Sequence, residues 1–352
     1  MRRIESPAAA GYAARAVPAV FALAMTSLAA AADPVTVTAV KAAATPALDG
    51  KADDGAWQQA QAVKVSMSGG VNFQGGSTQA TLKAVYTADS LCMLLQYDDP
   101  THSVRRSPYI KQEDGSWKKL KDPDDKGGDN NKFYEDKFAL IWPIKNSIKG
   151  FDQSGCMTAC HVGEAGKPYG NKYTASEGEL GDMWHMKTVR TGVVGQVDDQ
   201  YLDHTRYDPE KAKEAGRKAD AKTGGGYKDI ALVDGKPELM AKDGQPANAG
   251  GAYYLKDADK APLDDGKFKP GDEVASILVA PFTGDRGDIA SGMSYANGQW
   301  SFELCRKLVT GSPTDVQFDK LDAPYYFGLA AFDNAQVRHA FAASPLKLVF
   351  KP

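Results

Sequence analysis

The sequence contains few cysteines and no strong excess of charge. Only four of its 352 residues are cysteine, and the formal net charge at neutral pH is -3. Four cysteines are too few for a disulfide-built scaffold, so folding must rest on an ordinary hydrophobic core. Because no basic stripe is present, we expect no nucleic-acid partner. The sequence also lacks an internal repeat and a phosphate-binding glycine loop, since the glycines at 224–226 have no nucleotide-binding spacing.

Long apolar runs are missing beyond the N-terminal segment. Basic residues at positions 2, 3 and 15 precede an apolar stretch at 17–30, and alanines lead to Asp33. This order predicts a secretory signal peptide at 1–32, cleaved near Ala32. An uncleaved membrane anchor is the alternative, but the stretch is short for a helix that spans a bilayer. We expect export to the periplasm and a mature chain, 33–352, without stable membrane insertion.

Short strands dominate the pattern of the mature chain. Many such strands without alternating long helices indicate a mainly β fold, an antiparallel β-sandwich with long loop insertions and a few short helices. A tight turn is expected at residues 88–90. Alternating or apolar runs bounded by turn residues predict strands at 81–87, 91–97, 138–144, 274–281, 300–308, 325–332 and 346–350.

Two polar segments interrupt the strands. Residues 112–136 are charged and glycine-rich, which predicts a solvated loop. Residues 207–272 begin with a stretch typical of an exposed short helix, at 209–218, and continue without a consistent period. We interpret 207–272 as a polar insertion that covers a single sandwich domain, 33–352, and adds little core. A linker between two domains is the alternative, because loops this long are uncommon in compact folds.

The strongest local motif is GCMTACH, which contains Cys156, Cys160 and His161. In c-type haem attachment two thiols add to the haem vinyl groups, and a histidine directly after the second cysteine ligates the iron. The common motif has two residues between the cysteines, whereas this one has three. A small-loop disulfide and a zinc site are the alternatives, and zinc would need two further ligands. Export favours haem, because a free dithiol has few stable fates in an oxidising compartment.

The other cysteines and the adjacent acids have simpler interpretations. Cys92 and Cys305 lie within predicted strands, which favours buried free thiols over a disulfide. The acids at 198–199 and 264–265 are adjacent, so on a strand their side chains would point apart. We expect these acids to lie in solvated loops and not to form a catalytic pair.

Ten motifs together resemble one family. The chain is similar to the ethylbenzene dehydrogenase-related haem-binding domain, also described as the cytochrome c-552 and dimethyl sulfoxide reductase-like haem-binding domain. The resemblance covers nearly all of the mature chain. Its motifs are ALDGKADDGAW, VYTADSLCMLLQYDDPT, EDKFALIWPI, GCMTACH, DMWHMKTVRTG, GGGY, GDRGDI, WSFELCRKLVTG, DVQF and FGLAAFDNAQVRHA.

This resemblance implies a β-sandwich that holds one haem and transfers electrons, with a molybdoenzyme or a membrane cytochrome b as partner. In the b-haem branch of the family a methionine and a lysine ligate the iron. Cys156, Cys160 and His161 make this sequence similar to the c-type branch, with haem c as the cofactor. The DGKADDGAW stretch also resembles the start of family 9 carbohydrate-binding modules, which share the sandwich.

The second axial ligand must be a histidine, a methionine or a lysine. His339, in FDNAQVRHA, stands where the b-haem relatives carry their ligating lysine, so we predict it as the distal ligand. His185, in DMWHMK, is predicted to line the haem pocket and is the alternative axial ligand. His102 and His204 are expected at the surface.

Two functions from different classes remain. We expect an electron-transfer protein or subunit and not an enzyme, because a haem with two protein ligands leaves no position for a substrate. The alternative is an exported carbohydrate-binding module without haem, which would need exposed aromatic rings. We expect four tryptophans next to predicted strands to be core residues instead: Trp57, Trp142, Trp184 and Trp300.

Overall fold

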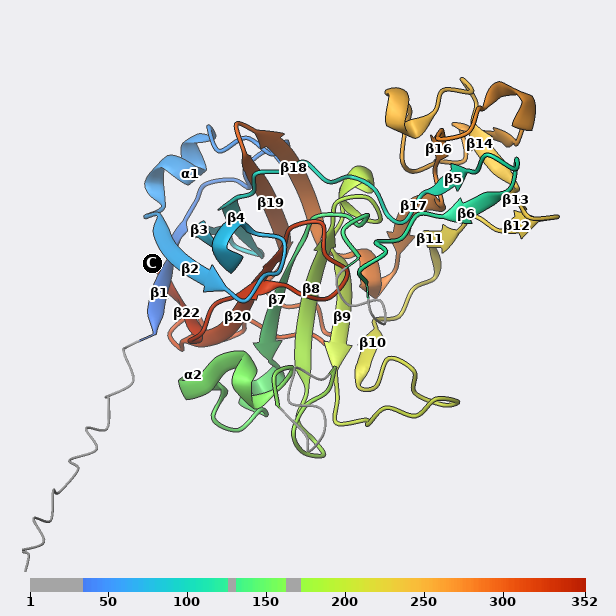
Figure 1. Ribbon diagram of the computed structural model, residues 1–352. Coiled ribbons are helices and arrows are strands. Elements are labelled where there is room, and N and C mark those ends of the chain that lie inside the picture. The colour runs from blue at the N-terminus through green and yellow to red at the C-terminus, as the bar shows by residue number, and fades with distance from the viewer. Residues whose placement is uncertain (1–33, 126–130, 163–171) are drawn as a thin grey trace, which may run out of the picture. The chain divides into compact units, whose positions relative to one another are not determined.

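Most strands belong to one 13-stranded sheet that folds over into the two layers of a β-sandwich (Figure 1). The structure is a computed structural model that describes residues 34–125, 131–162 and 172–352. The first layer contains β10 (Arg217–Ala219), β9 (Asp198–Leu202), β8 (Gly181–Lys187), β7 (Lys137–Pro143) and β20 (Tyr325–Phe332). The second contains β2 (Val63–Ser68), β3 (Ser77–Tyr86), β4 (Ser90–Asp98), β19 (Gln299–Lys307) and β18 (Ala290–Ala296). Three strands connect the layers: β21 (Ala340–Phe341), β1 (Val35–Lys41) and β22 (Leu346–Lys351).

Neighbouring strands in this sheet pair antiparallel, except that β1 pairs in parallel with β22 and with β3. The predicted antiparallel sandwich is therefore confirmed, with a parallel contact where the two ends of the described chain meet. The predicted strands 81–87, 91–97, 138–144, 300–308 and 346–350 correspond to β3, β4, β7, β19 and β22, and 325–332 matches β20. The run 274–281 divides into β16 (Glu273–Val274) and β17 (Ile277–Thr283).

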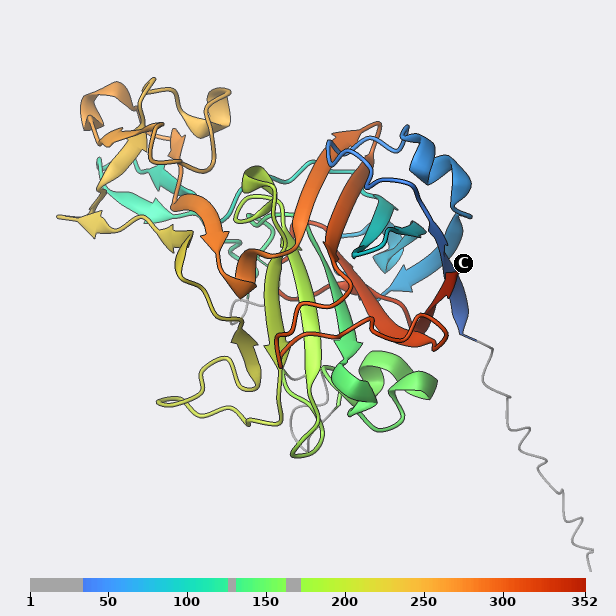
Figure 2. The ribbon, with the colours of Figure 1, turned by 180° about the vertical axis from the view of Figure 1, so that it is seen from behind.

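Helices are short in the described residues, as predicted. Figure 2 shows from behind how α2 lies at one end of β7 and β20. None of these helices is long and apolar enough to cross a membrane. The α-helices are α1 (Gly55–Gln59) and α2 (Phe151–Ser154), and the 3-10 helices are η1 (Gln74–Gly76), η2 (Ile144–Asn146), η3 (Gly155–Thr158), η4 (Gly192–Val194), η5 (Ala247–Ala249), η6 (Asp265–Lys267) and η7 (Asp285–Gly287).

The main core lies between the two layers. Successive side chains of a strand point to opposite faces, so every second residue enters this core. On β20 these are Phe327, Leu329 and Ala331, all fully buried. The predicted burial of the four tryptophans is confirmed, because Trp57, Trp142, Trp184 and Trp300 are at most 1% exposed.

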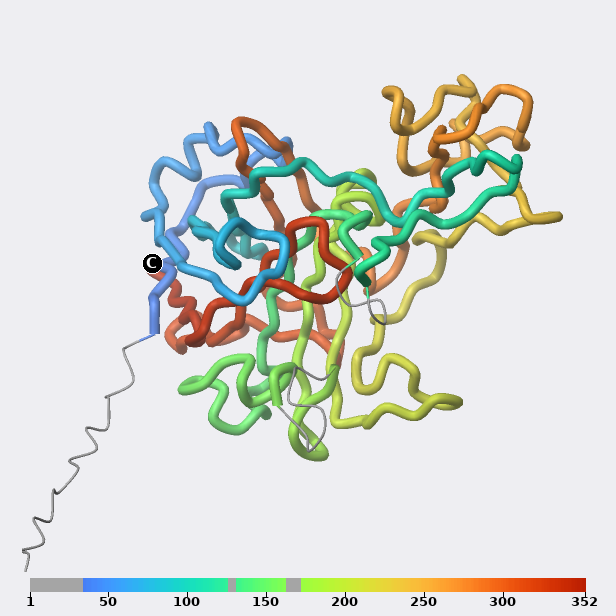
Figure 3. Tube along the Cα trace, in the orientation of Figure 1, coloured from blue at the N-terminus to red at the C-terminus, as the bar shows by residue number. Residues whose placement is uncertain are grey.

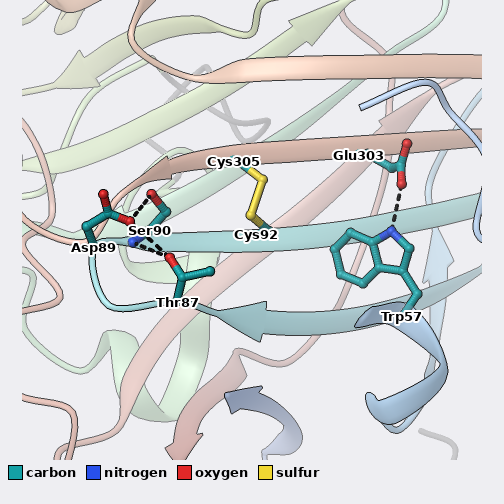
Figure 4. Close-up of a disulfide and its surroundings, with 7 residues drawn as sticks. All are labelled: Trp57, Thr87, Asp89, Ser90, Cys92, Glu303 and Cys305. Atoms are coloured by element: carbon teal, nitrogen blue, oxygen red, sulfur yellow. Dashed lines mark hydrogen bonds between the residues drawn. A yellow bond between two sulfur atoms is a disulfide. The ribbon is translucent and has the colours of Figure 1, made fainter. Parts of the chain in front are cut away.

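The outer face of the second layer is covered by α1, and it carries a disulfide (Figure 4). Cys92 and Cys305 are bonded to each other, so the prediction of two free thiols was wrong. The reason is register: β4 pairs with β19 so that Cys92 lies directly opposite Cys305, with 4.2 Å between their Cα atoms. Nearby, the Trp57 indole donates a 2.6 Å hydrogen bond to Glu303, which attaches α1 to β19.

The insertion at 207–272 is more ordered than its composition suggested. Residues 112–136 contribute β6 (Trp117–Lys119), and the chain trace in Figure 3 shows that β6 and β5 (Tyr109–Lys111) run beside the insertion. Together they enclose a separate hydrophobic cluster that includes Tyr109, Trp117, Leu255 and Phe268. The prediction that the insertion adds little core was therefore wrong. Its remaining strands are β11 (Gly224–Asp229), β12 (Leu232–Val233), β13 (Lys236–Pro237), β14 (Leu239–Ala241) and β15 (Lys260–Pro262).

The helix predicted at 209–218 is not formed. Instead, the carboxylate of Asp208 accepts hydrogen bonds from the backbone N–H groups of Glu210 and Lys211. Such side-chain bonds to the local backbone favour turns over helix. Glu214 pairs with Arg217 and Lys172.

We expect the Cys92–Cys305 disulfide to contribute substantially to stability, because it joins residues 213 positions apart. Replacing both cysteines by alanine should lower the free energy of unfolding by roughly 2–5 kcal/mol, measured by guanidinium denaturation. A reductant should destabilise the wild-type protein to a similar degree and leave the double variant unchanged. Alkylation of both residues in denatured, unreduced protein would contradict the bond.

Candidate functional site

The candidate site lies on the outer face of the first layer. On β7, β8 and β20 the residues that alternate with the core positions include Ile141, Met183 and Gly328. Ile141 and Met183 pack with Phe151 of α2 and with Cys156 of η3 in a small hydrophobic cluster. The segment that carries the GCMTACH motif is therefore held against the sheet by apolar contacts.

Two glycines allow this close approach. A Cβ atom on Gly328 would lie 2.1 Å from the sulfur of Cys156, so only glycine fits between the strand and the thiol. Gly155 has φ +54°, and its Cβ would lie 3.1 Å from the backbone nitrogen of Pro345. Side chains rarely adopt such a conformation, which explains the glycine that begins the motif.

The two thiols of the motif are not bonded to each other in this structure. Burial raises the pKa of Cys156 well above its ordinary value, and burial raises the pKa of Cys160 to about 12. Both sulfurs are therefore protonated at neutral pH. A neutral thiol is a poor ligand for a metal ion, because the thiolate is the form that binds metal.

His161 and His339 meet beside this segment. Their Nε2 atoms are 3.4 Å apart, although the two residues are 178 positions apart in the chain. The ring of Phe341 lies 4.3 Å from that of His161, between centroids, and the ring of Phe332 lies 4.7 Å from that of His339. The sheet thus brings together the two histidines that the sequence singled out as iron ligands.

Hydrogen bonding and burial determine the tautomer and the protonation state of this histidine pair. The Nδ1 atom of His339 lies 2.7 Å from the carbonyl oxygen of Val337, so Nδ1–H donates and Nε2 keeps its lone pair. Burial and then the neighbouring His161 lower the pKa of His339 to about 4, and burial also lowers the pKa of His161. Both rings are neutral at pH 7, which is the form that ligates a metal.

His185 lies behind Phe332, which separates it from His339. Its ring stacks on Phe332 with 5.8 Å between centroids, and Phe332 in turn contacts His339. His185 is buried, its Nδ1 lies 3.4 Å from Gln200, and its Nε2 has no hydrogen-bond partner among the described residues. His102 and His204 are exposed, as predicted.

The cysteines and histidines do not converge on one point. Within the described residues, the groups of three or more side chains that are close enough to share a metal ion consist of aspartates alone. A tetrahedral zinc ion requires four ligands around one point. The arrangement therefore does not fit the zinc alternative, whereas thiols attach to the edge of a haem and histidines ligate its centre.

Buried charges flank the site, and sequence reasoning missed them. Asp198 is fully buried on β9 and accepts hydrogen bonds from Lys187, Arg286 and Tyr227. Burial alone would raise the pKa of Asp198, but Lys187 and Arg286 outweigh it and hold that pKa at about 2. Asp199 is equally buried on the opposite face, so the prediction that both acids are solvated was wrong. Lys187, the cation on the neighbouring strand that pairs with Asp198, was the available signal.

The family model described as ethylbenzene dehydrogenase matches residues 54–344. The chain belongs to the ethylbenzene dehydrogenase family. The matched region contains Cys156, Cys160, His161, His185 and His339. No curated protein matches the chain.

Among solved structures, this member of the ethylbenzene dehydrogenase family is similar to carbohydrate-binding proteins. A family 9 carbohydrate-binding module from Caldicellulosiruptor kristjanssonii, in complex with cellotriose, is 9% identical with a TM-score of 0.32, covering 90% of this chain and 95% of that one. A protein from Bacteroides uniformis described as carbohydrate-binding is 8% identical with a TM-score of 0.37, covering 90% and 100%. Similarity this low carries no functional conclusion.

Replacing Gly328 by alanine should displace the segment that carries Cys156. Because the added Cβ would overlap the sulfur, we expect the free energy of unfolding to fall by about 1–3 kcal/mol. The matched control is Gly55→Ala, since a Cβ there meets no atom within 4 Å. Equal stability of the two variants in denaturant titrations would show that Cys156 does not rest on Gly328.

Proposed function

We propose that the protein is a mono-haem c-type cytochrome of the ethylbenzene dehydrogenase family. Cys156 and Cys160 hold the haem covalently, and His161 and His339 ligate its iron. The observation that carries this proposal is the 3.4 Å approach of the two Nε2 atoms, with the His339 lone pair freed by its Nδ1 hydrogen bond. The haem supplies one-electron redox chemistry, and the chain fixes its ligands and surroundings.

The side chains around the two histidines suit a redox centre of low polarity. Phe332 and Phe341 flank the two histidines, and Cys156 is packed among apolar residues. The ammonium group of Lys137 also contacts Phe332 and lies 4.2 Å from the centroid of its ring. Burial and then repulsion from Arg190 lower the pKa of Lys137 well below its ordinary value.

The proposed physiological role is electron transfer in the periplasm after removal of residues 1–32, which lie outside the described residues. Family membership supports association with a molybdoenzyme, and a membrane cytochrome b is the other partner that we propose. His161 and His339 are each partly exposed, so the centre is near enough to the surface to exchange electrons with a docked protein. We propose an electron carrier or subunit, and not a catalyst.

The four tryptophans and the best-defined cavity do not favour the carbohydrate-binding alternative. The four tryptophans that were candidates for sugar stacking are buried. A cavity of about 400 Å³ lies beside β4, β18 and β19, but the side chains that line it, such as Gln96, Asp98 and Gln299, carry no aromatic ring. Sugar sites on sandwiches usually stack the sugar on such rings. A colourless protein that binds oligosaccharides would nevertheless favour this alternative.

Covalent attachment is tested by the paired variant Cys156→Ser and Cys160→Ser, produced together with haem-attachment machinery. We expect the wild-type protein to retain haem through denaturing electrophoresis and the variant to lose it. Cys92→Ala with Cys305→Ala is the matched control, because it removes the same number of sulfurs elsewhere. If the denatured double variant of Cys156 and Cys160 still retains haem, the haem is attached through other residues.

Axial ligation is tested by His339→Ala. Loss of the sixth ligand should convert a low-spin haem to a high-spin form that binds carbon monoxide readily when reduced, as seen in absorption spectra. His185→Ala should keep the low-spin spectrum, because Phe332 separates His185 from the pair. If instead the low-spin spectrum survives in His339→Ala and is lost in His185→Ala, the distal ligand is His185.

A further inference from the structure

Six aspartates interact electrostatically with one another, and four of them also interact with a single guanidinium group: Asp182, Asp199, Asp288 and Asp315, with Asp220 and Asp285 as the other two. The guanidinium belongs to Arg306, which donates a 2.8 Å hydrogen bond to Asp182. Six carboxylates and one guanidinium would leave five negative charges if every group were ionised. Arg286, which follows Asp285 in the sequence, is engaged with Asp198 on the outer face.

Five of these acids form two overlapping groups that share Asp315. Arg306 is the cation that pairs with the inner group, since its Nη1 lies 3.7 Å from Asp199 and 3.6 Å from Asp315. In the outer group, Asp220, Asp285 and Asp315, one oxygen of each carboxylate lies within 4.8 Å of the other two. The electrostatic partners of Asp220 are themselves acids.

A second observation indicates a ligand for the outer group. Asp220 is only 4% exposed, and neither of its carboxylate oxygens accepts a hydrogen bond of normal geometry from a described residue, although the Thr314 hydroxyl interacts with it. One oxygen of Asp315 is likewise buried without a partner. Burying carboxylates without partners is costly, so an ion or a proton must compensate them.

We propose that Asp220, Asp285 and Asp315 bind one calcium ion. The three carboxylates offer only oxygen ligands, which a hard divalent cation prefers. Calcium accepts six to eight oxygens in flexible geometry, and Asp288 and water can complete its shell, whereas magnesium requires a near-ideal octahedron. Asp285 is partly exposed, which gives the ion a path from solvent.

The ion would join three segments that are distant in the chain. Asp220 follows β10, Asp285 lies in η7, and Asp315 lies in the connection between β19 and β20. It would therefore link the edge of the first layer to the strand that carries Arg306. This role is independent of the proposed haem, so its test does not depend on haem attachment.

The test is calorimetric titration of calcium chloride into the chelator-treated full-length protein, with thermal unfolding measured in parallel. We expect one saturable site and a higher melting temperature with calcium. Asp220→Asn and Asp285→Asn should each weaken calcium affinity about tenfold or more, since each removes a charged ligand. In chelator, Asp220→Asn should melt at the same temperature as the wild-type protein or higher, because it removes repulsion. A merely structural role for Asp220 would instead lower the melting temperature in both conditions.

Asp333→Asn is the matched control, because Asp333 belongs to the separate buried group Asp99, Asp136 and Asp333. It should leave calcium affinity unchanged. The proposal would be overturned if the protein showed no saturable calcium binding or bound magnesium chloride with equal affinity. It would also be overturned if Asp333→Asn lost calcium binding while Asp220→Asn and Asp285→Asn kept it. Asp285→Asn keeps the test decisive if Asp220→Asn fails to fold, since Asp285 is not fully buried.

Discussion

The layer of β7, β8 and β20 is buried on both faces, and the position of the site depends on that fact. The inner face packs into the core through residues such as Phe327, while the outer face is covered by α2 and η3. Because α2 and η3 cover this sheet face, water is excluded from the side chains between the helices and the sheet. The absence of a side chain at Gly328 lets the sulfur of Cys156 pack directly against the strand. This contact positions the segment that carries Cys156 and His161 against the sheet.

The sandwich could be predicted because its strands are short, apolar and punctuated by turn residues. Prediction failed where pairing or tertiary contact decides the outcome. Cys92 and Cys305 look like ordinary core thiols until the register of β4 against β19 sets them face to face. The insertion looks polar along the chain because its few apolar residues, among them Leu255 and Phe268, gather only after it folds against Trp117. The helix at 209–218 was lost to a local turn that Asp208 caps.

The candidate site was predictable in part, for a different reason. GCMTACH is a local motif, so Cys156, Cys160 and His161 could be found by spacing. The pairing of His339 with His161 came from family resemblance, and no local pattern indicates it. The place of His185 behind Phe332 depends on which side chains share one face of three paired strands. Such juxtapositions require register, which a single sequence does not contain.

Register also explains why charge is buried on both sides of β9. Asp198 lies opposite His185 of β8 and meets Lys187 and Arg286, whereas Asp199 lies opposite Trp184 and faces Arg306. A slip of β9 by one residue would move each side chain to the other face. Asp198 would then lose two cations at once, and a buried carboxylate without partners is strongly unfavourable. The two adjacent acids therefore select one pairing of β9 with β8. Through that pairing they also position His185, whose ring stacks on Phe332 beside His339.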